Sequence, residues 1–173
     1  MEEVILVNEQ DEQVGSMEKM EAHYKGILHR AFSIFIFNER GEMLLQQRAK
    51  SKYHSGGLWT NACCSHPRPG EDIEQAATRR LHEELGFSTS IKKIFHFRYN
   101  ASFTNGLTEH EFDHVFVGNY HGSIMPDAYE VEDYCFKTMH EISTSIESHA
   151  HKYTAWFCIA FPKVFKWWQS QGH

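Results

Sequence analysis

The sequence has no surplus of positive charge. Its 173 residues include 17 lysines and arginines against 23 aspartates and glutamates, a net charge of −6 with histidine neutral. Binding to nucleic acid depends largely on cations that neutralise phosphates, so this balance argues against nucleic acid as a partner. A small phosphorylated ligand needs only a few cations and is compatible with the same balance.

Long apolar runs and a signal peptide are also missing. No apolar stretch is long enough to span a bilayer, and the N-terminus, MEEVILVNEQ, is acidic where a signal peptide would be basic. We therefore expect a cytoplasmic protein without a membrane partner. The cysteines fit that compartment as free thiols, and their spacing matches no zinc ribbon or finger. They are Cys63, Cys64, Cys135 and Cys158.

The chain contains no internal repeat, low-complexity tract or linker, so we expect one domain over residues 1–173. Hydrophobic residues make up 41% and charged residues 23%, which is ordinary for a globular protein. Strands and helices mix without regular alternation. This pattern favours an α+β fold, with a mixed β-sheet core flanked by helices.

Periodicity and turn residues predict the elements. Strands are expected at 4–7, in both arms of a hairpin over 29–48, and at 91–103, 107–122 and 130–138. Helices are expected at 16–24, 71–85, 139–148 and 153–169. Ser16 is the expected N-cap of the first helix, and residues 59–67 are expected to form a loop. The run SIFIF is expected to be a central strand buried on both sides.

Two charged residues of the 71–85 helix fall in the same sector as its apolar residues. Arg80 and Glu84 share the sector of Ile73, at a spacing that lets them contact each other. A buried charge must be paired or must bind a ligand. A partly buried salt bridge and a functional pair are therefore both open. Arg79 and Glu83 have the same spacing on the outer flank, where we expect a solvated pair.

Residues 59–67 carry two adjacent thiols and a histidine before a helix N-terminus. Because neighbouring side chains point in different directions, Cys63 and Cys64 cannot both enter one site. A cysteine is more often a small buried hydrophobe than a nucleophile. Here His66 and the helix start favour a lowered thiol pKa and one reactive thiolate.

Glu109 and Glu111 are two residues apart on an expected strand, so both point to one face. That face is either solvent-exposed or holds a metal ion or a shared proton. His23 and His29 each suit a surface position when taken alone. Together with His66 and the two carboxylates they would form a nitrogen and oxygen ligand set for Zn, Mn or Fe.

These motifs resemble a known family. GEDIEQAATRRLHEELGF is similar to the Nudix box, except that Ser65 replaces its first glycine and Arg80 replaces the glutamate after its arginine. WTNACCSHP, the EHE at 109–111 and EKMEAHYKGILHRAFS resemble the signatures of type I isopentenyl diphosphate isomerases, over nearly the whole chain. The resemblance implies a Nudix-like fold. It also implies interconversion of isopentenyl and dimethylallyl diphosphate by moving a double bond.

The resemblance also implies roles for individual residues. Cys64, Glu111 and Tyr99 would be catalytic, and Cys63 would serve packing. Diphosphate and hydrocarbon contacts would come from Lys19, Arg48, Lys52, Arg80 and Trp156. One Mn²⁺ or Zn²⁺ would bind His23, His29, His66, Glu109 and Glu111, and Glu84 would bind Mg²⁺ that accompanies the diphosphate.

Three further expectations complete the interpretation. The resemblance implies a small-molecule diphosphate substrate and a monomer or weak homodimer. A Nudix pyrophosphohydrolase and a catalytically silent metal-binding module are the alternatives, and Arg80 in place of the box glutamate argues against the first. Cys135, Cys158, His54, His140, His149 and His151 are expected to be structural or surface residues.

Overall fold

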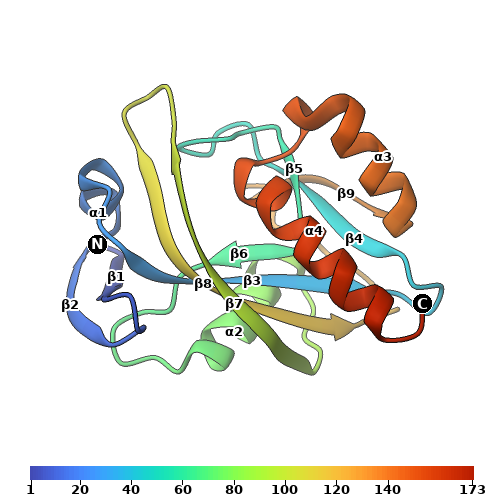
Figure 1. Ribbon diagram of the computed structural model, residues 1–173, viewed down its shortest axis with the longest axis horizontal. Helices are drawn as coiled ribbons and strands as arrows, with labels where there is room; N and C mark the ends of the chain where they lie inside the picture. The colour runs from blue at the N-terminus through green and yellow to red at the C-terminus, as the bar shows by residue number, and fades with distance from the viewer.

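The computed structural model describes residues 1–173 as a single nine-stranded sheet with helices on both faces (Figure 1). The strands are β1 (Glu3–Val7), β2 (Gln13–Glu18), β3 (His29–Phe37), β4 (Met43–Arg48), β5 (Trp59–Thr60), β6 (Cys63–Ser65), β7 (Ile91–Ser102), β8 (Thr108–Asn119) and β9 (Val131–Lys137). The helices are α1 (Lys19–Lys25), α2 (Ile73–Leu85), α3 (Met139–His149), a 3-10 turn (Ala150–Lys152) and α4 (Ala155–Ser170). This mixed architecture agrees with the expected α+β fold.

Strand β3 is the centre of the sheet. It pairs antiparallel with β1, β4 and β6. It pairs parallel with β8 along its whole length, from His29 opposite Glu111 to Phe37 opposite Asn119. Strand β8 also pairs antiparallel with β7. These two form the long hairpin that crosses the front of the sheet in Figure 1. The expected central strand is confirmed.

Alternate residues of β3 enter two separate cores. Phe32, Ile34 and Ile36 pack with α2 on one face, whereas Phe35 and Phe37 pack with α3 and α4 on the other. Side chains of a strand alternate between faces, so a strand covered on both sides is apolar throughout. This explains the unbroken run SIFIF. In Figure 1, α2 lies beneath the sheet, and α3 and α4 lie above it.

Helix α2 ends at Leu85 as its sequence predicts, and it begins at Ile73, two residues later than expected. Asp72 caps it by accepting hydrogen bonds from the backbone N–H groups of Glu74 and Gln75. Gly86 ends it at φ 73°, and a Cβ there would lie 2.5 Å from the carbonyl oxygen of Met125. Only glycine fits both the left-handed backbone and this close approach.

Two predictions of secondary structure are wrong, at Ser16 and in residues 59–67, because these residues pair with strands that are distant in sequence. Ser16 is not a helix cap but a residue of β2, where it lies opposite Ile5 of β1, and Glu18 caps α1 instead. Residues 59–67 are not wholly a loop, because β6 pairs with β3. Such long-range partners are invisible to local sequence patterns. Helix α4 continues through Pro162, and none of the helices is long and apolar enough to cross a membrane.

The packing of α4 gives a test of the core. Phe157 is fully buried and stacks on Phe35, with ring centroids 6.3 Å apart. We expect Phe157→Ala to lower the free energy of unfolding by about 3–5 kcal/mol because it removes an aromatic ring and leaves a cavity. Ile159→Ala on the exposed side of the same helix is the matched control, with an expected loss of about 1 kcal/mol or less. Urea unfolding followed by circular dichroism measures both, and equal losses would contradict the assignment of this core.

Candidate active site

Two adjoining cavities lie where α1, the 49–58 loop, β6 and the β7–β8 hairpin meet the first turn of α4. The outer cavity has a volume of about 90 Å³ and a charged lining that includes Lys19, Lys52, Arg80, Glu84 and Glu130. The inner one is about 30 Å³, and its lining includes His54, Tyr99, Glu109, Glu111 and Trp156. Both share Arg48, Tyr53, Cys64, Ser65 and His66. One continuous site therefore has a charged entrance and a closed interior.

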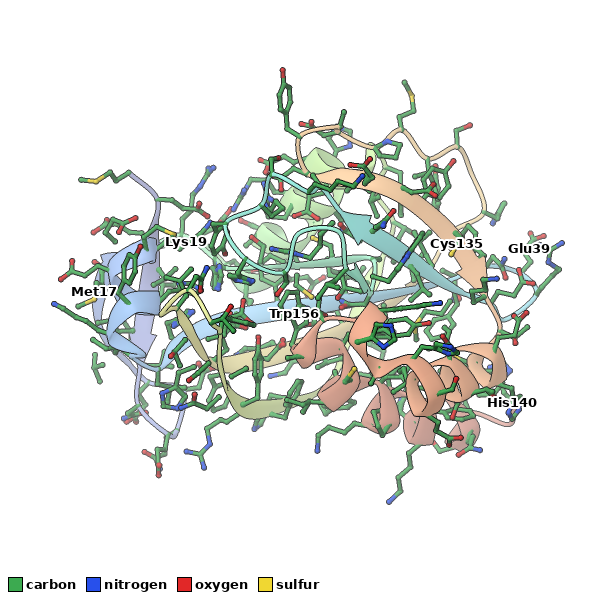
Figure 2. The ribbon with its side chains drawn as sticks, turned by 90° about the horizontal axis from the view of Figure 1, so that it is seen from above. Met17, Lys19, Glu39, Cys135, His140 and Trp156 are labelled. Atoms are coloured by element: carbon green, nitrogen blue, oxygen red, sulfur yellow. The ribbon has the colours of Figure 1, made fainter.

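Figure 2 shows where this site lies in the molecule. Lys19 is the first residue of α1 and Trp156 the second of α4. Lys19 lies toward the left of the view and Trp156 near the middle, whereas Cys135 and His140 lie toward the right. A larger open depression of about 770 Å³ beside α3 is lined by Cys135 and His140 and by none of the residues with an expected catalytic, substrate or metal role. Size alone therefore does not locate the chemistry.

Three histidines and a carboxylate converge beside the inner cavity. His23 from α1, His29 from β3, His66 after β6 and Glu111 from β8 have donor atoms that all lie within 4.8 Å of one another. His29 and Glu111 meet because they are direct partners in the parallel β3–β8 pairing. All four side chains are buried, which contradicts a surface position for His23 and His29.

The histidine tautomers fit a bound metal ion. His23 Nδ1 lies 2.6 Å from the Lys19 carbonyl oxygen, and His29 Nδ1 lies 2.8 Å from that of Ile27. A carbonyl can only accept, so each Nδ1 carries a proton, and Nε2 of the neutral ring presents a lone pair. Both Nε2 atoms are buried without a hydrogen-bond partner. Backbone carbonyls fix metal-binding histidines in this way, and imidazole with carboxylate suits a divalent transition metal.

Glu109 belongs to a second group. Its carboxylate lies within 4.8 Å of His23 and His54, and no group of mutually close donor atoms joins it to Glu111. Tyr99 connects the two carboxylates because its hydroxyl lies 2.8 Å from Glu109 Oε2 and 2.7 Å from Glu111 Oε2, and its one proton can be donated to either. Both carboxylates are 5% exposed, which contradicts a solvent-facing strand. The sequence did not identify His54 because no local pattern marks it.

Burial and charge set the protonation of this cluster. Burial lowers the pKa of His66 to about 4, although Glu111 opposes the shift. Burial alone would raise the pKa of Glu111, but contacts with His29 and His66 outweigh it and hold this pKa well below the ordinary range. Burial and the two carboxylates raise the pKa of the Tyr99 phenol. The tyrosine therefore stays protonated beside ionised Glu111.

Cys64 also lines the inner cavity and is held by three neighbours. Its Sγ donates to Asn61 Oδ1 at 3.1 Å, receives the indole N–H of Trp156 at 3.1 Å, and lies 3.4 Å from Ser33 Oγ. Cys63, on the opposite face of β6, lies wholly within the core below α2. The two adjacent thiols thus point in opposite directions, and only Cys64 faces the cavity.

The expected lowering of the thiol pKa is wrong. Burial is the largest influence and raises the Cys64 pKa, with a further contribution from Asp113. Cys64 is therefore a neutral thiol in the resting protein.

The four expected diphosphate contacts line the outer cavity together, and three of them are already paired with acids. Lys19 contacts Glu2 at 2.9 Å, and Lys52 contacts Glu130. Arg80 donates to Glu84 at 2.7 Å and to Glu130 at 3.1 Å. The Arg80–Glu84 pair is therefore a partly buried salt bridge whose two members also line a cavity, so a structural and a functional role both stay open. Arg48 lies 5.1 Å from the Trp156 ring centroid and is not in an ion pair.

Comparison with known proteins identifies the family. The Nudix domain family matches residues 27–157. A protein of Pectobacterium atrosepticum named isopentenyl-diphosphate Delta-isomerase is 48% identical over 97% of this chain and 94% of its own length. One from Burkholderia multivorans with the same name is 44% identical over 96% and 97%. The chain belongs to the isopentenyl-diphosphate Delta-isomerase family.

Solved structures support the Nudix fold of this isomerase family member. A protein from Deinococcus radiodurans has a TM-score of 0.79 at 18% identity and covers 94% of this chain and 98% of its own. A MutT protein from Methanosarcina mazei has a TM-score of 0.66 at 20% identity, covering 80% and 94%. The Nudix match and the buried histidine–glutamate cluster together indicate a divalent metal ion.

The environment of Cys64 predicts that its thiol reacts slowly with alkylating reagents in this isomerase family member. We expect iodoacetamide to modify Cys64 at pH 7 at least about tenfold more slowly in the folded than in the urea-unfolded protein, because only the thiolate reacts. Its folded-state pKa is raised, so the rate should keep rising as pH increases from 7 to 10. Peptide mass spectrometry follows each cysteine, with half-buried Cys135 as the internal control. A rate that is already constant above pH 7 would show a thiolate instead.

Proposed function

We propose that the protein interconverts isopentenyl diphosphate and dimethylallyl diphosphate, in the supply of isoprenoid precursors. The observation that carries this proposal is the high identity to curated isomerases over nearly the whole chain. The site is consistent with it: a cationic outer cavity adjoins an inner one that holds a thiol, a carboxylate and a tyrosine. We further propose that residues 1–173 act as one cytoplasmic isomerase domain, monomeric or weakly dimeric.

The reaction adds one proton and removes another. Protonation of the terminal methylene carbon of isopentenyl diphosphate gives a tertiary carbocation, and loss of a proton from the neighbouring methylene creates the new double bond. An acid and a base must therefore face the hydrocarbon. Cys64 and the Glu111–Tyr99 pair are the groups that we assign to these roles.

The resting protonation states suggest which group acts first. A neutral Cys64 thiol has a proton to give, and an ionised Glu111 carboxylate can take one. A carboxyl group that donates and a thiolate that accepts would need the opposite resting protonation states. The two roles exchange in the return reaction. Tyr99 stabilises charge on the carboxylate because it donates to Glu111 Oε2 at 2.7 Å.

The inner cavity is suited to a carbocation. Its volume of about 30 Å³ has room for little more than one water molecule. Side chains such as Trp156 must therefore move when the hydrocarbon enters, and the displaced water cannot trap the cation. The Trp156 ring already faces the Arg48 guanidinium at 5.1 Å, and the same ring can stabilise a carbocation through its π electrons.

Metal ions have two separate places in this proposal. Mn²⁺ or Zn²⁺ would bind His23, His29, His66, Glu109 and Glu111, where it would hold the carboxylates in position and keep Glu111 ionised. Glu84 would bind Mg²⁺ that enters with the diphosphate. One carboxylate together with substrate phosphates is a common Mg²⁺ environment. Glu84 is 6% exposed and lines the outer cavity, which suits that role.

Hydrolysis of a nucleoside diphosphate is disfavoured by Arg80. A guanidinium stands where the Nudix box has a glutamate for metal-assisted hydrolysis, and it points into the outer cavity beside Glu84 and Glu130. Incubation with isopentenyl diphosphate and Mg²⁺ therefore should give dimethylallyl diphosphate and no free phosphate. Phosphate release from nucleoside diphosphates without isomerisation would reverse this conclusion.

The acid–base pair can be tested by isotope exchange. We expect Cys64→Ala and Glu111→Gln each to reduce isomerisation and deuterium uptake from heavy water by at least about a hundredfold, the usual contribution of a positioned acid or base. Nuclear magnetic resonance of the product measures both. Cys158→Ala, at the surface of α4, is the control and should keep the parent rate. Near-normal turnover in either site variant would remove that residue from its role.

The diphosphate contacts can be tested by comparing two nearby lysines. Lys52→Met removes a cation from the outer cavity, and we expect the KM for isopentenyl diphosphate to rise about tenfold to a hundredfold. Lys50→Met is the matched control, because Lys50 is largely exposed, contacts Glu132 only at 4.0 Å and does not line the cavity. Steady-state kinetics distinguish them. Similar KM values for the two variants would place the diphosphate elsewhere.

A further inference from the structure

His54 lies inside the site without a role in the reaction described above. It belongs to the loop between β4 and β5, and its side chain is 2% exposed. The ring stacks on Phe103 with centroids 4.5 Å apart at 9°, and its centroid lies 5.7 Å from that of Trp156. A histidine buried this deeply is usually satisfied by hydrogen bonds or bound to a metal.

The backbone around His54 is tightly constrained. The next residue, Ser55, has a left-handed φ of 53°, which is uncommon outside glycine. A Cβ at Gly56 would lie 2.6 Å from the Lys50 carbonyl oxygen, so no other residue fits there without a shift. Arg48 also donates from Nη2 to the His54 carbonyl oxygen at 3.1 Å. The loop therefore holds the imidazole in a defined position.

The Nε2 atom of His54 faces the Glu109 carboxylate without forming a hydrogen bond to it. His54 Nε2 lies 2.9 Å from Glu109 Oε1, yet the angle is not that of a hydrogen bond and Nε2 remains unpartnered and buried. Nδ1 has its own neighbour, the Ser55 hydroxyl at 3.2 Å. Without a proton on Nε2, its lone pair and a carboxylate oxygen at this distance repel each other unless a cation lies between them.

The spacing is that of two ligands on one ion. Donor atoms about 2.1 Å from a transition metal and at right angles to each other are separated by about 3 Å. His54, Glu109 and His23 also form a group whose donor atoms lie within 4.8 Å of one another.

We propose that His54 is an additional ligand of the divalent ion, on the side of the site where Glu109 lies; this assignment rests on the metal centre of the proposed function. Both groups of donor atoms include His23, whose Nδ1 is engaged with the Lys19 carbonyl, so only its Nε2 can bind a metal. One nitrogen binds one ion, and the two groups therefore bind the same ion. The two groups of donor atoms have only His23 in common, so His54 and Glu109 would move toward the other donors as the ion binds. The ion would then hold Glu109 and Glu111 in place.

The ligand also couples the metal to the diphosphate contacts. The loop that carries His54 includes Lys52, and it follows directly after Arg48; all three residues line the two cavities. Metal binding to His54 therefore fixes the loop that carries Lys52 and whose His54 carbonyl oxygen accepts from Arg48. Loss of this ligand should weaken metal binding and loosen that segment at the same time.

The test compares metal binding in His54→Phe and in the parent protein. Phenylalanine keeps the aromatic contact with Phe103 and removes the nitrogen. We expect Zn²⁺ affinity, measured by competition with a chelator, to fall about tenfold to a hundredfold. X-ray absorption of the Zn-loaded proteins should count four imidazoles in the parent and three in the variant. Phe103→Leu removes the stacking partner without removing a ligand, and His151→Phe removes an exposed histidine; both should keep the parent affinity and four imidazoles.

A second variant keeps the inference falsifiable if His54→Phe does not fold. His54→Ala leaves space for free imidazole, which should restore Zn²⁺ affinity when added. Unchanged affinity in both variants would overturn the proposal. So would weaker affinity with an unchanged count of three imidazoles in parent and variant, because His54 would then only position Glu109. Isomerisation by the parent protein is assayed separately, so a failure of the proposed function is distinguishable from a failure of this ligand assignment.

Discussion

The parallel pairing of β3 with β8 is the constraint on which the site depends. Its register places His29 opposite Glu111, and the antiparallel β7–β8 pairing places Tyr99 opposite the same glutamate. Side chains of a strand alternate between faces, so a slip of one residue would move both carboxylates away from the histidines. The hydrophobic residues that fix this register therefore also fix the catalytic geometry.

The buried polar cluster is stable only because the sheet around it is well packed. Burial of a carboxylate or an unpaired imidazole nitrogen is unfavourable unless a partner or a metal compensates. Strand β3 is apolar on both faces, with α2 on one side and α3 and α4 on the other. The cluster lies at its first residue, His29, where the cores end. Strand β3 thus contributes apolar side chains to the two cores along most of its length and a polar side chain to the site at its first residue.

Much of this arrangement could be predicted from local sequence, and the remainder could not. The limits of α2 follow from Asp72 and Gly86, and the central position of β3 follows from its apolar run. The strand at Ser16 depends on pairing with β1, which no local pattern indicates. The neutral state of Cys64 depends on the depth of its burial, and His54 meets Glu109 only through tertiary packing. Predictions failed where a residue's partner is distant in sequence.

The charge balance of the outer cavity explains why a divalent ion should accompany the substrate. Its lining contains four cations, Lys19, Arg48, Lys52 and Arg80, and three carboxylates, Glu2, Glu84 and Glu130. Lys19, Lys52 and Arg80 are already paired with these acids. A diphosphate alone would therefore compete with carboxylates for cations that have little free charge to offer. A divalent ion adds two positive charges and turns Glu84 from a competitor into a ligand. The same acids keep the cations buried and ordered before substrate arrives, so one set of residues provides both stability without the ligand and selectivity for a metal-bound diphosphate.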